Sequence, residues 1–127
     1  MNRRGISTLA TMVALLTLID MPTATLSQSI LGIASVIDGD TIEIHSQRIR
    51  LYGIDAPEGD QPCMRSTGER WRCGQQASFA LADRIGRATI SFQARDPVCF
   101  KGNEDLSRWM VITGWAVVAP EVIAAWR

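Results

Sequence analysis

Four charged side chains in residues 36–58 have types and an order that could act on a phosphodiester. Asp40 and Asp55 offer the carboxylate oxygens that a hard cation such as Ca²⁺ prefers. Arg50 lies between them in the sequence and can hold a phosphate oxygen through a bidentate fork. Glu58 can orient or deprotonate a water molecule. A cation site, an anion clamp and a base together indicate phosphodiester hydrolysis.

Two short strands and their turns must bring these side chains together. Asp38-Gly39-Asp40 predicts a tight turn, because glycine and aspartate tolerate backbone angles that other residues resist. Thr41–Ile44 alternates apolar and polar residues, and His45-Ser46 can turn the chain into a second strand over residues 47–54. The sequence therefore predicts a hairpin that begins directly after Asp40.

The second strand of this hairpin sorts its side chains by face. Leu51 and Arg50 fall on opposite faces, so Arg50 is expected to point away from the apolar side. Pro57 cannot extend a hydrogen-bonded ladder, which predicts that Asp55 and Glu58 lie where the strand ends. An alternative interpretation remains open, in which the turn only reverses the chain and Arg50 pairs with a nearby surface acid.

Three motifs in this region resemble the staphylococcal nuclease (thermonuclease) family. They are D-G-D-T at residues 38–41, R-I-R-L at 48–51 and I-D-A-P-E at 54–58, and the likeness extends over residues 33–118. The resemblance implies a mainly β fold with helices, built as an OB-fold β-barrel. It also implies a Ca²⁺ cofactor and hydrolysis of phosphodiester bonds, with single-stranded DNA or RNA as the substrate.

The resemblance assigns roles to individual residues. Asp40 and Asp55 correspond to Ca²⁺ ligands, and the backbone carbonyl of Ala56 corresponds to a third ligand. Arg50 corresponds to the first catalytic arginine and Glu58 to the general base.

One element of that family is missing from the sequence. Members usually carry a second catalytic arginine in a D-x-Y-G-R loop, whereas residues 91–100 contain no Tyr-Gly-Arg. Compared with members of that family, this chain lacks a piece of strand and loop that would be inserted between Asp96 and Val98. Losing a hydrogen-bond donor that stabilises the transition state typically lowers the rate about 10²–10³-fold, so we expect weak nuclease activity. Arg95 is the nearest arginine that could substitute.

The first 27 residues have the pattern of a secretory signal peptide. Arg3 and Arg4 precede an apolar run over residues 5–19, and small residues follow it. The run is shorter than the roughly 20 residues that a membrane span needs, although an uncleaved anchor remains the alternative. We therefore expect residues 28–127 to form an exported OB-fold domain, incomplete at its C-terminal end. It is predicted to be a periplasmic or secreted monomer without stable membrane association.

Charge and cysteine content set further limits. The chain has 13 basic and 13 acidic residues, so no bulk charge draws it to nucleic acid, but arginines outnumber acids over residues 48–95. Cys63 and Cys73 flank a polar insert and could form a disulfide in an oxidising compartment or remain free thiols. Cys99 lies in an apolar run and is expected in the core.

The remaining elements follow from periodicity and helix-end signals. Apolar residues recur every four positions over residues 75–85, which predicts a helix ended by Gly86. Arg84 and Arg87 near its end could bind phosphate, although a solvated helix end is the simpler interpretation. A second helix over residues 104–113 is predicted to be capped by Asn103. Strands are expected at residues 29–37 with a bend at Gly32, and at 88–92, 98–100 and 115–118, followed by an apolar tail at 122–126.

Three functions remain open from the sequence. The first is an exported Ca²⁺-dependent nuclease weakened by the missing arginine. The second is a catalytically impaired OB-fold accessory protein of the envelope, for instance in succinoglycan-type exopolysaccharide biosynthesis, since OB-folds bind oligonucleotides and oligosaccharides. The third is a fragment whose small core cannot keep it folded.

Overall fold

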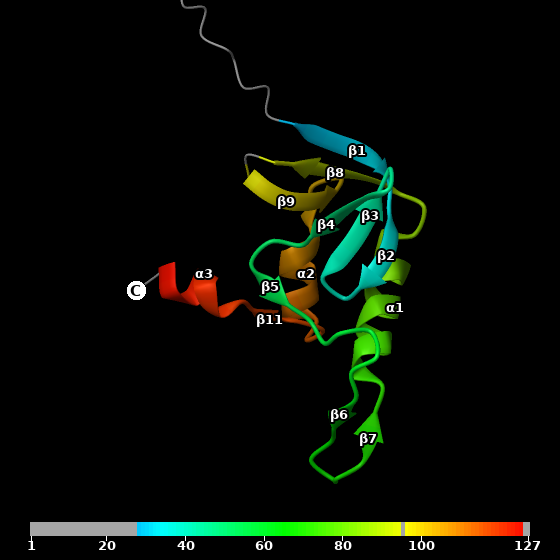
Figure 1. Ribbon diagram of the computed structural model, residues 1–127, viewed down its shortest axis with the longest axis vertical. Coiled ribbons are helices and arrows are strands. Elements are labelled where there is room, and N and C mark those ends of the chain that lie inside the picture. The colour runs from blue at the N-terminus through cyan, green and yellow to red at the C-terminus, as the bar shows by residue number, and fades with distance from the viewer. Residues whose placement is uncertain (1–27, 95, 126–127) are drawn as a thin grey trace, which may run out of the picture.

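The computed structural model describes residues 28–94 and 96–125, so the predicted leader at residues 1–27 lies outside the described part. The fold is mainly β with helices, which confirms the predicted class (Figure 1). The strands are β1 Ser29–Ile33, β2 Ser35–Asp38, β3 Thr41–Ile44, β4 Gln47–Arg50, β5 Ile54–Asp55, β6 Cys63–Met64, β7 Arg70–Trp71, β8 Thr89–Gln93, β9 Asp96–Lys101, β10 Glu104–Asp105 and β11 Val117–Val118. The helices are α1 Cys73–Ile85, α2 Leu106–Ile112 and α3 Pro120–Ala125.

The described strands pair antiparallel in four sheets. β1, β8, β9 and β10 form one sheet, and β2, β3 and β4 form another, while β5 pairs with β11 and β6 with β7. Within residues 28–94 and 96–125 these ladders do not close into a barrel. The predicted strand over residues 29–37 is divided at Ala34, so β1 and β2 join different sheets. Gly32 lies against Ile44 and His45, where a side chain on residue 32 would clash.

The predicted hairpin is confirmed. Asp38 lies opposite Thr41, so the Gly39-Asp40 pair forms the first turn. His45 and Ser46 both have positive φ, 52° and 62°, as a two-residue type I′ hairpin turn requires. The second strand ends at Arg50 rather than at residue 54, because Gly53 adopts φ 75° and redirects the chain into β5.

The predicted periodicity places α1 correctly, although the helix begins two residues earlier. Ala77, Leu81 and Ile85 are all buried, which confirms the expected apolar face. Gly86 ends the helix with φ 55° and donates its N–H to the carbonyl oxygen of Ala82.

The predicted start of the second helix is wrong. Glu104 and Asp105 pair with Lys101 and Phe100 in the β9–β10 ladder, so α2 begins only at Leu106. The cap is Asp105 rather than Asn103, because the Asp105 side chain accepts a hydrogen bond from the Arg108 N–H at 3.1 Å. Strand pairing by the two acids therefore overrides the helix signal in the local sequence.

The last third departs from the expected pattern in two places. β9 pairs with β8 from Asp96 onward, so this strand is longer than the predicted 98–100 segment. The expected apolar tail forms α3 up to Ala125, and residues 126–127 lie outside the described part. None of the described helices combines the length and apolar character needed to span a bilayer.

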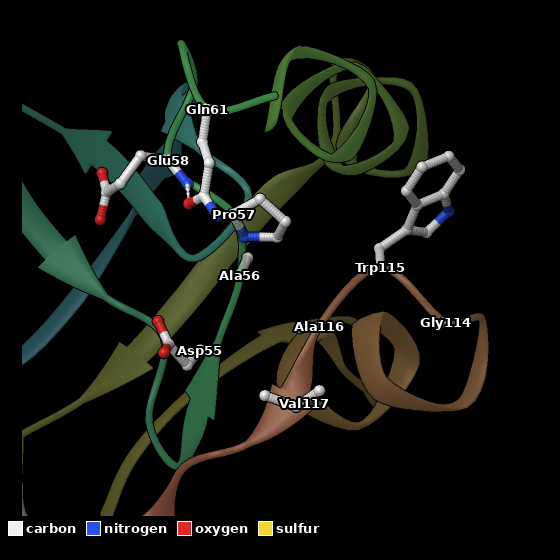
Figure 2. A pocket seen from close by; sticks show the side chains of 9 residues that line it. All are labelled: Asp55, Ala56, Pro57, Glu58, Gln61, Gly114, Trp115, Ala116 and Val117. Carbon is white, nitrogen blue, oxygen red and sulfur yellow. Dashed lines mark hydrogen bonds between the residues drawn. The ribbon is translucent and has the colours of Figure 1, made fainter. Parts of the chain in front are cut away.

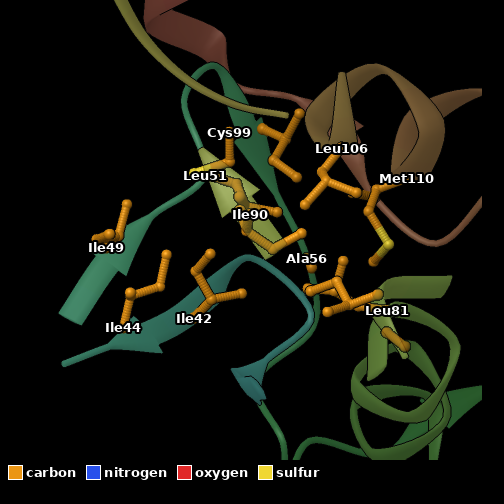
Figure 3. Packing of buried hydrophobic residues seen from close by; sticks show 14 residues of the cluster. Ile42, Ile44, Ile49, Leu51, Ala56, Leu81, Ile90, Cys99, Leu106 and Met110 are labelled. Carbon is orange, nitrogen blue, oxygen red and sulfur yellow. The ribbon is translucent and has the colours of Figure 1, made fainter. Parts of the chain in front are cut away.

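One apolar cluster joins both larger sheets to the helices (Figure 3). The cluster includes Ile42, Ile44, Ile49, Leu51, Leu81, Ile90, Cys99, Leu106 and Met110. Cys99 is a fully buried free thiol, as predicted, and burial raises its pKa to about 12. Cys99 is therefore a neutral packing residue at physiological pH.

Candidate functional site

The Asp40 carboxylate is the buried centre of the candidate site. Its side chain is only 3% exposed and accepts hydrogen bonds from Thr41 Oγ1 at 2.9 Å and from the Ala56 N–H at 3.2 Å. The Asp40 carbonyl oxygen accepts the Leu51 N–H at 2.7 Å. One residue in the first turn therefore holds the chain at two points, directly after β4 and directly after β5.

Close backbone packing makes this arrangement possible. A Cβ at Gly39 would lie 2.9 Å from the Cβ atoms of both Ala56 and Ala77, closer than carbon atoms normally approach. Glycine is therefore required next to Asp40 because the turn touches the β5 end on one side and α1 on the other.

Arg50 brings the two predicted aspartate ligands together. Its Nη2 atom lies 3.2 Å from Asp40 Oδ2 and 3.4 Å from Asp55 Oδ1. The side chains of Arg50 and Asp55 are 60% and 55% exposed, so this end of the cluster is open to solvent. Asp55 lies at the end of a strand, as the sequence predicted.

Two of these residues, Asp40 and Asp55, carry the carboxylate oxygens that a calcium ion prefers. A cation in the place of Arg50 Nη2 would need to draw the oxygens of Asp40 and Asp55 inward by only about 1 Å to reach Ca²⁺–oxygen distances. The Ala56 backbone lies beside the Asp40 carboxylate because its N–H is bonded there. The described residues contain no group of three or more acidic, histidine or cysteine ligands, so carbonyl oxygens and water would have to complete the shell.

Glu58 lies in a loop that is fastened at several points. Its N–H donates to Gln61 Oε1 at 3.2 Å, and its carbonyl oxygen accepts the Gln61 N–H at 2.9 Å. The next residue, Gly59, donates its N–H to Asp38 Oδ1 at 2.9 Å. The loop that carries the predicted base is therefore tied to the turn that carries Asp40.

The start of α1 supports the same loop from the other side. Cys63 and Cys73 form a disulfide with Cα atoms 5.5 Å apart, which resolves the alternative that the sequence left open. Gly74 donates its N–H to the Gln61 carbonyl oxygen at 3.2 Å, and a Cβ at Gly74 would overlap the Glu58 carbonyl. Gly74 was expected in a loop, and its role in placing Glu58 was missed.

An open cleft of about 380 Å³ lies beside Asp55 and Glu58. It is lined by Asp55, Ala56, Pro57, Glu58, Gln61, Gly114, Trp115, Ala116 and Val117. Figure 2 shows Trp115 on one side of the loop backbone and the Asp55 and Glu58 carboxylates on the other side, with the indole and the carboxylates directed away from each other. Gln61 and Trp115 were not predicted as site residues. Trp115 is distant from Glu58 in the sequence, whereas Gln61 is only three residues away and its proximity to Glu58 was the available signal.

The arginines outside this cluster have other positions. Arg84 donates from Nε to Glu104 Oε2 at 2.8 Å and stacks over the Trp109 ring at 5.4 Å, so it fastens α1 to β10. These hydrogen bonds raise the pKa of Arg84 and lower the pKa of Glu104. Arg87 is exposed just after the helix. Arg95, the proposed substitute for the missing arginine, lies outside the described residues.

Comparison with known proteins provides one informative relative. No protein-family model matches the chain. The chain is 40% identical over 103 residues to the succinoglycan biosynthesis protein ExoI of Rhizobium meliloti (strain 1021). The match covers 72% of this chain and 53% of that protein, so the chain spans about half the length of this relative.

Proposed function

We propose that the chain is an accessory protein of exopolysaccharide biosynthesis in the cell envelope and that it binds glycan in the cleft beside Asp55 and Glu58. The observation that carries this proposal is the lining of the cleft, which combines the Trp115 indole with the Gln61 amide and with the acidic residues Asp55 and Glu58. The similarity to a succinoglycan biosynthesis protein supports the choice of pathway. A periplasmic or secreted location is part of the same proposal.

The cleft has the mixture of surfaces that a sugar ring needs. A pyranose ring has apolar C–H faces and a rim of hydroxyl groups. An indole covers an apolar face, while the Asp55 and Glu58 carboxylates accept hydrogen bonds and the Gln61 amide donates and accepts them. Ligand sites commonly combine an apolar wall with a few fixed polar groups in this way. The hydrogen-bonded loop and its disulfide hold these groups in place before binding.

A binding titration tests this proposal. Fluorescent succinoglycan oligosaccharides are titrated with the full-length oxidised chain, and Trp115→Ala is expected to weaken binding about tenfold or more, because aromatic anchors dominate such contacts. Phe79→Ala removes an aromatic ring that is 53% exposed on α1, outside the cleft, and serves as the control. Equal affinity of Trp115→Ala and the unsubstituted chain would contradict the proposal, as would the absence of glycan binding.

A second candidate function is Ca²⁺-dependent phosphodiester hydrolysis of the thermonuclease type. The specific observation in its favour is the single Arg50 nitrogen within 3.4 Å of both Asp40 and Asp55. Asp40, Asp55 and the Ala56 carbonyl would hold the ion, which supplies Lewis-acid charge to a phosphodiester oxygen when bound.

The chain's own groups define the rest of this second candidate. Arg50 binds a phosphate oxygen through its guanidinium fork, and Glu58 accepts a proton from the attacking water. The direct β8–β9 turn carries no Tyr-Gly-Arg sequence, so the second guanidinium of the thermonuclease pattern is missing. The rate of hydrolysis is therefore expected to be lower than that of a complete site by about 10²–10³-fold or more.

A calcium titration with a fluorescent single-stranded oligonucleotide tests hydrolysis. Slow cleavage that requires Ca²⁺ and disappears in Glu58→Ala supports the second candidate. Glu69→Ala, which removes an exposed acid outside the cleft, is the control and should retain the rate. Glycan binding without any Ca²⁺-dependent cleavage would leave only the accessory role.

A further inference from the structure

A basic hairpin projects from the molecule next to the cleft. Strands β6 and β7 and their connection occupy residues 63–71, and Figure 1 shows them extending beyond α1, at the opposite end from β1, β8 and β9. Every residue from 64 to 70 is exposed. Even the apolar side chain of Met64 is 69% exposed, so this hairpin contributes little to the core.

The hairpin is nevertheless held in one shape. The Cys63–Cys73 disulfide closes its base. At its tip, the Arg65 N–H donates to the Glu69 carbonyl oxygen at 2.8 Å and the Gly68 N–H donates to the Arg65 carbonyl oxygen at 2.9 Å. A preformed exposed element of this kind loses little conformational entropy when it binds a partner.

Two of the three arginines between the disulfide cysteines, at residues 63–73, are free to bind a ligand. Arg65 is already engaged, because it lies 3.6 Å from Glu69 and stacks over the Trp71 ring at 5.0 Å. Arg70 and Arg72 are exposed, and neither forms an ion pair with the residues that the structure describes. The structure therefore presents two unused guanidinium forks on a rigid support.

The hairpin is continuous with the cleft. Arg72 lines a second cavity of about 340 Å³ together with Gly59, Asp60 and Gln75. This cavity and the cleft border the same loop, because Glu58 and Gln61 line the cleft while the residues between them line the second cavity. A polymer in the cleft can therefore extend past Arg72 towards Arg70.

We propose that Arg70 and Arg72 bind carboxylate groups of an acidic polysaccharide whose neighbouring sugars occupy the cleft. This inference rests on the proposed glycan-binding function. A guanidinium fork matches a carboxylate through two parallel hydrogen bonds. The hairpin thus supplies a preference for charged glycan over neutral glycan.

Charge distribution favours a sparsely charged polymer over nucleic acid. A nucleic-acid strand carries one negative charge per roughly 3.4 Å, and proteins that bind it usually present a broadly basic surface. This chain has a formal net charge of zero, Asp55 and Glu58 line the cleft, and Asp60 lines the cavity that contains Arg72. These acids repel a continuous polyanion but tolerate a polysaccharide with isolated carboxylates.

The test compares an acidic succinoglycan oligosaccharide with the same oligosaccharide after its carboxylates are converted to neutral amides. The unsubstituted chain is expected to bind the acidic form about tenfold more tightly at low salt, a preference that weakens as salt screens the charges. The double variant Arg70→Gln/Arg72→Gln should bind both forms with the affinity that the unsubstituted chain has for the neutral form. Arg48→Gln/Arg87→Gln removes the same charge elsewhere and should retain the preference.

The outcomes separate this inference from the proposed function. Equal affinity of the unsubstituted chain for both forms overturns the role of the hairpin and leaves glycan binding in place. Failure to bind either form overturns both proposals. A preference that survives in Arg70→Gln/Arg72→Gln also overturns the hairpin site. Tighter binding of a single-stranded oligonucleotide than of the acidic glycan, lost in the same variant, reassigns the hairpin to nucleic acid.

Discussion

At the scale of single residues, Asp40 combines a structural role with a possible chemical one. Its buried carboxylate accepts two hydrogen bonds from neighbouring segments and lies 3.2 Å from the Arg50 guanidinium. Asp55 contacts the same guanidinium but is largely exposed. The two aspartates therefore differ in what their removal should do to stability, although both belong to the same candidate cation site.

Asp40→Asn is expected to lower the free energy of unfolding by about 1–3 kcal/mol. The amide keeps only one oxygen for the Thr41 and Ala56 donors, and it leaves Arg50 without a buried charge partner. Asp55→Asn is the matched control and should cost less than about 0.5 kcal/mol, since exposed ion pairs contribute little. Urea denaturation measures both values, and equal stability of the two variants would contradict the structural role of Asp40.

The Arg84–Glu104 pair predicts a pH dependence. Hydrogen bonding to Arg84 lowers the pKa of Glu104 below its ordinary value of 4.5, so its stabilising effect is present above pH 4.5 and is lost as the pH falls through the lowered value. Glu104→Gln should therefore be less stable than the unsubstituted chain at neutral pH, and the difference should shrink below pH 4.5.

Thermal unfolding across the acid range measures this difference. Glu121→Gln removes an exposed acid on α3 that makes no ion pair with the described residues, and it should give a much smaller difference at neutral pH. A Glu104→Gln difference that stays constant from neutral pH to below 4.5 would show that charge is not its origin.

At the scale of elements, the candidate site depends on how α1 meets the loop that carries Glu58. The helix approaches this loop so closely that residue 74 has no space for a side chain. The disulfide at Cys73 and the Gly74–Gln61 hydrogen bond act at the same junction. The helix start therefore determines where the loop lies and how wide the cleft beside it is.

Gly74→Ala is expected to destabilise the chain by about 2 kcal/mol or more, because the new methyl group overlaps the Glu58 carbonyl and the backbone must move. The displaced loop should also weaken glycan binding in the cleft. Gln76→Ala, an exposed change in the same helical turn, should stay within about 0.5 kcal/mol. Urea denaturation and the binding titration check both effects, and a fully stable Gly74→Ala variant would contradict the packing argument.

At the scale of the whole molecule, a single core connects the elements that carry the site. Leu81 of α1, Met110 of α2 and Ile42 of β3 are fully buried in one apolar cluster. In the last third of the chain, helix α2 contributes buried side chains to this cluster. A single cooperative melting transition would distinguish this arrangement from the third function considered from the sequence, an unfolded fragment.

Leu81→Ala is expected to cost about 2–5 kcal/mol and to lower the midpoint of one shared transition, because the cavity lies where helices and sheets meet. Leu31→Ala removes the same atoms at a position that is 65% exposed and should cost far less. Far-ultraviolet and near-ultraviolet circular dichroism should give the same melting curve. Separate transitions would show that the elements do not share one cooperative core.

The sequence by itself determined the features that depend on local spacing. Alternation predicted the β3–β4 hairpin, the four-residue apolar spacing predicted the buried face of α1, and short separations predicted that Arg50 meets Asp40 and Asp55. Turn chemistry and periodicity act over a few residues, so they can be recognised without knowing the fold.

Only the tertiary structure decided what depends on contacts between distant segments. It paired Cys63 with Cys73 and placed Trp115 on the same cleft as Glu58. Each outcome reflects the packing of one segment against another, which is a long-range interaction that local sequence patterns do not encode. The charged cluster is therefore a property of the hairpin sequence, whereas the cleft and the projecting basic hairpin beside it are properties of the folded chain.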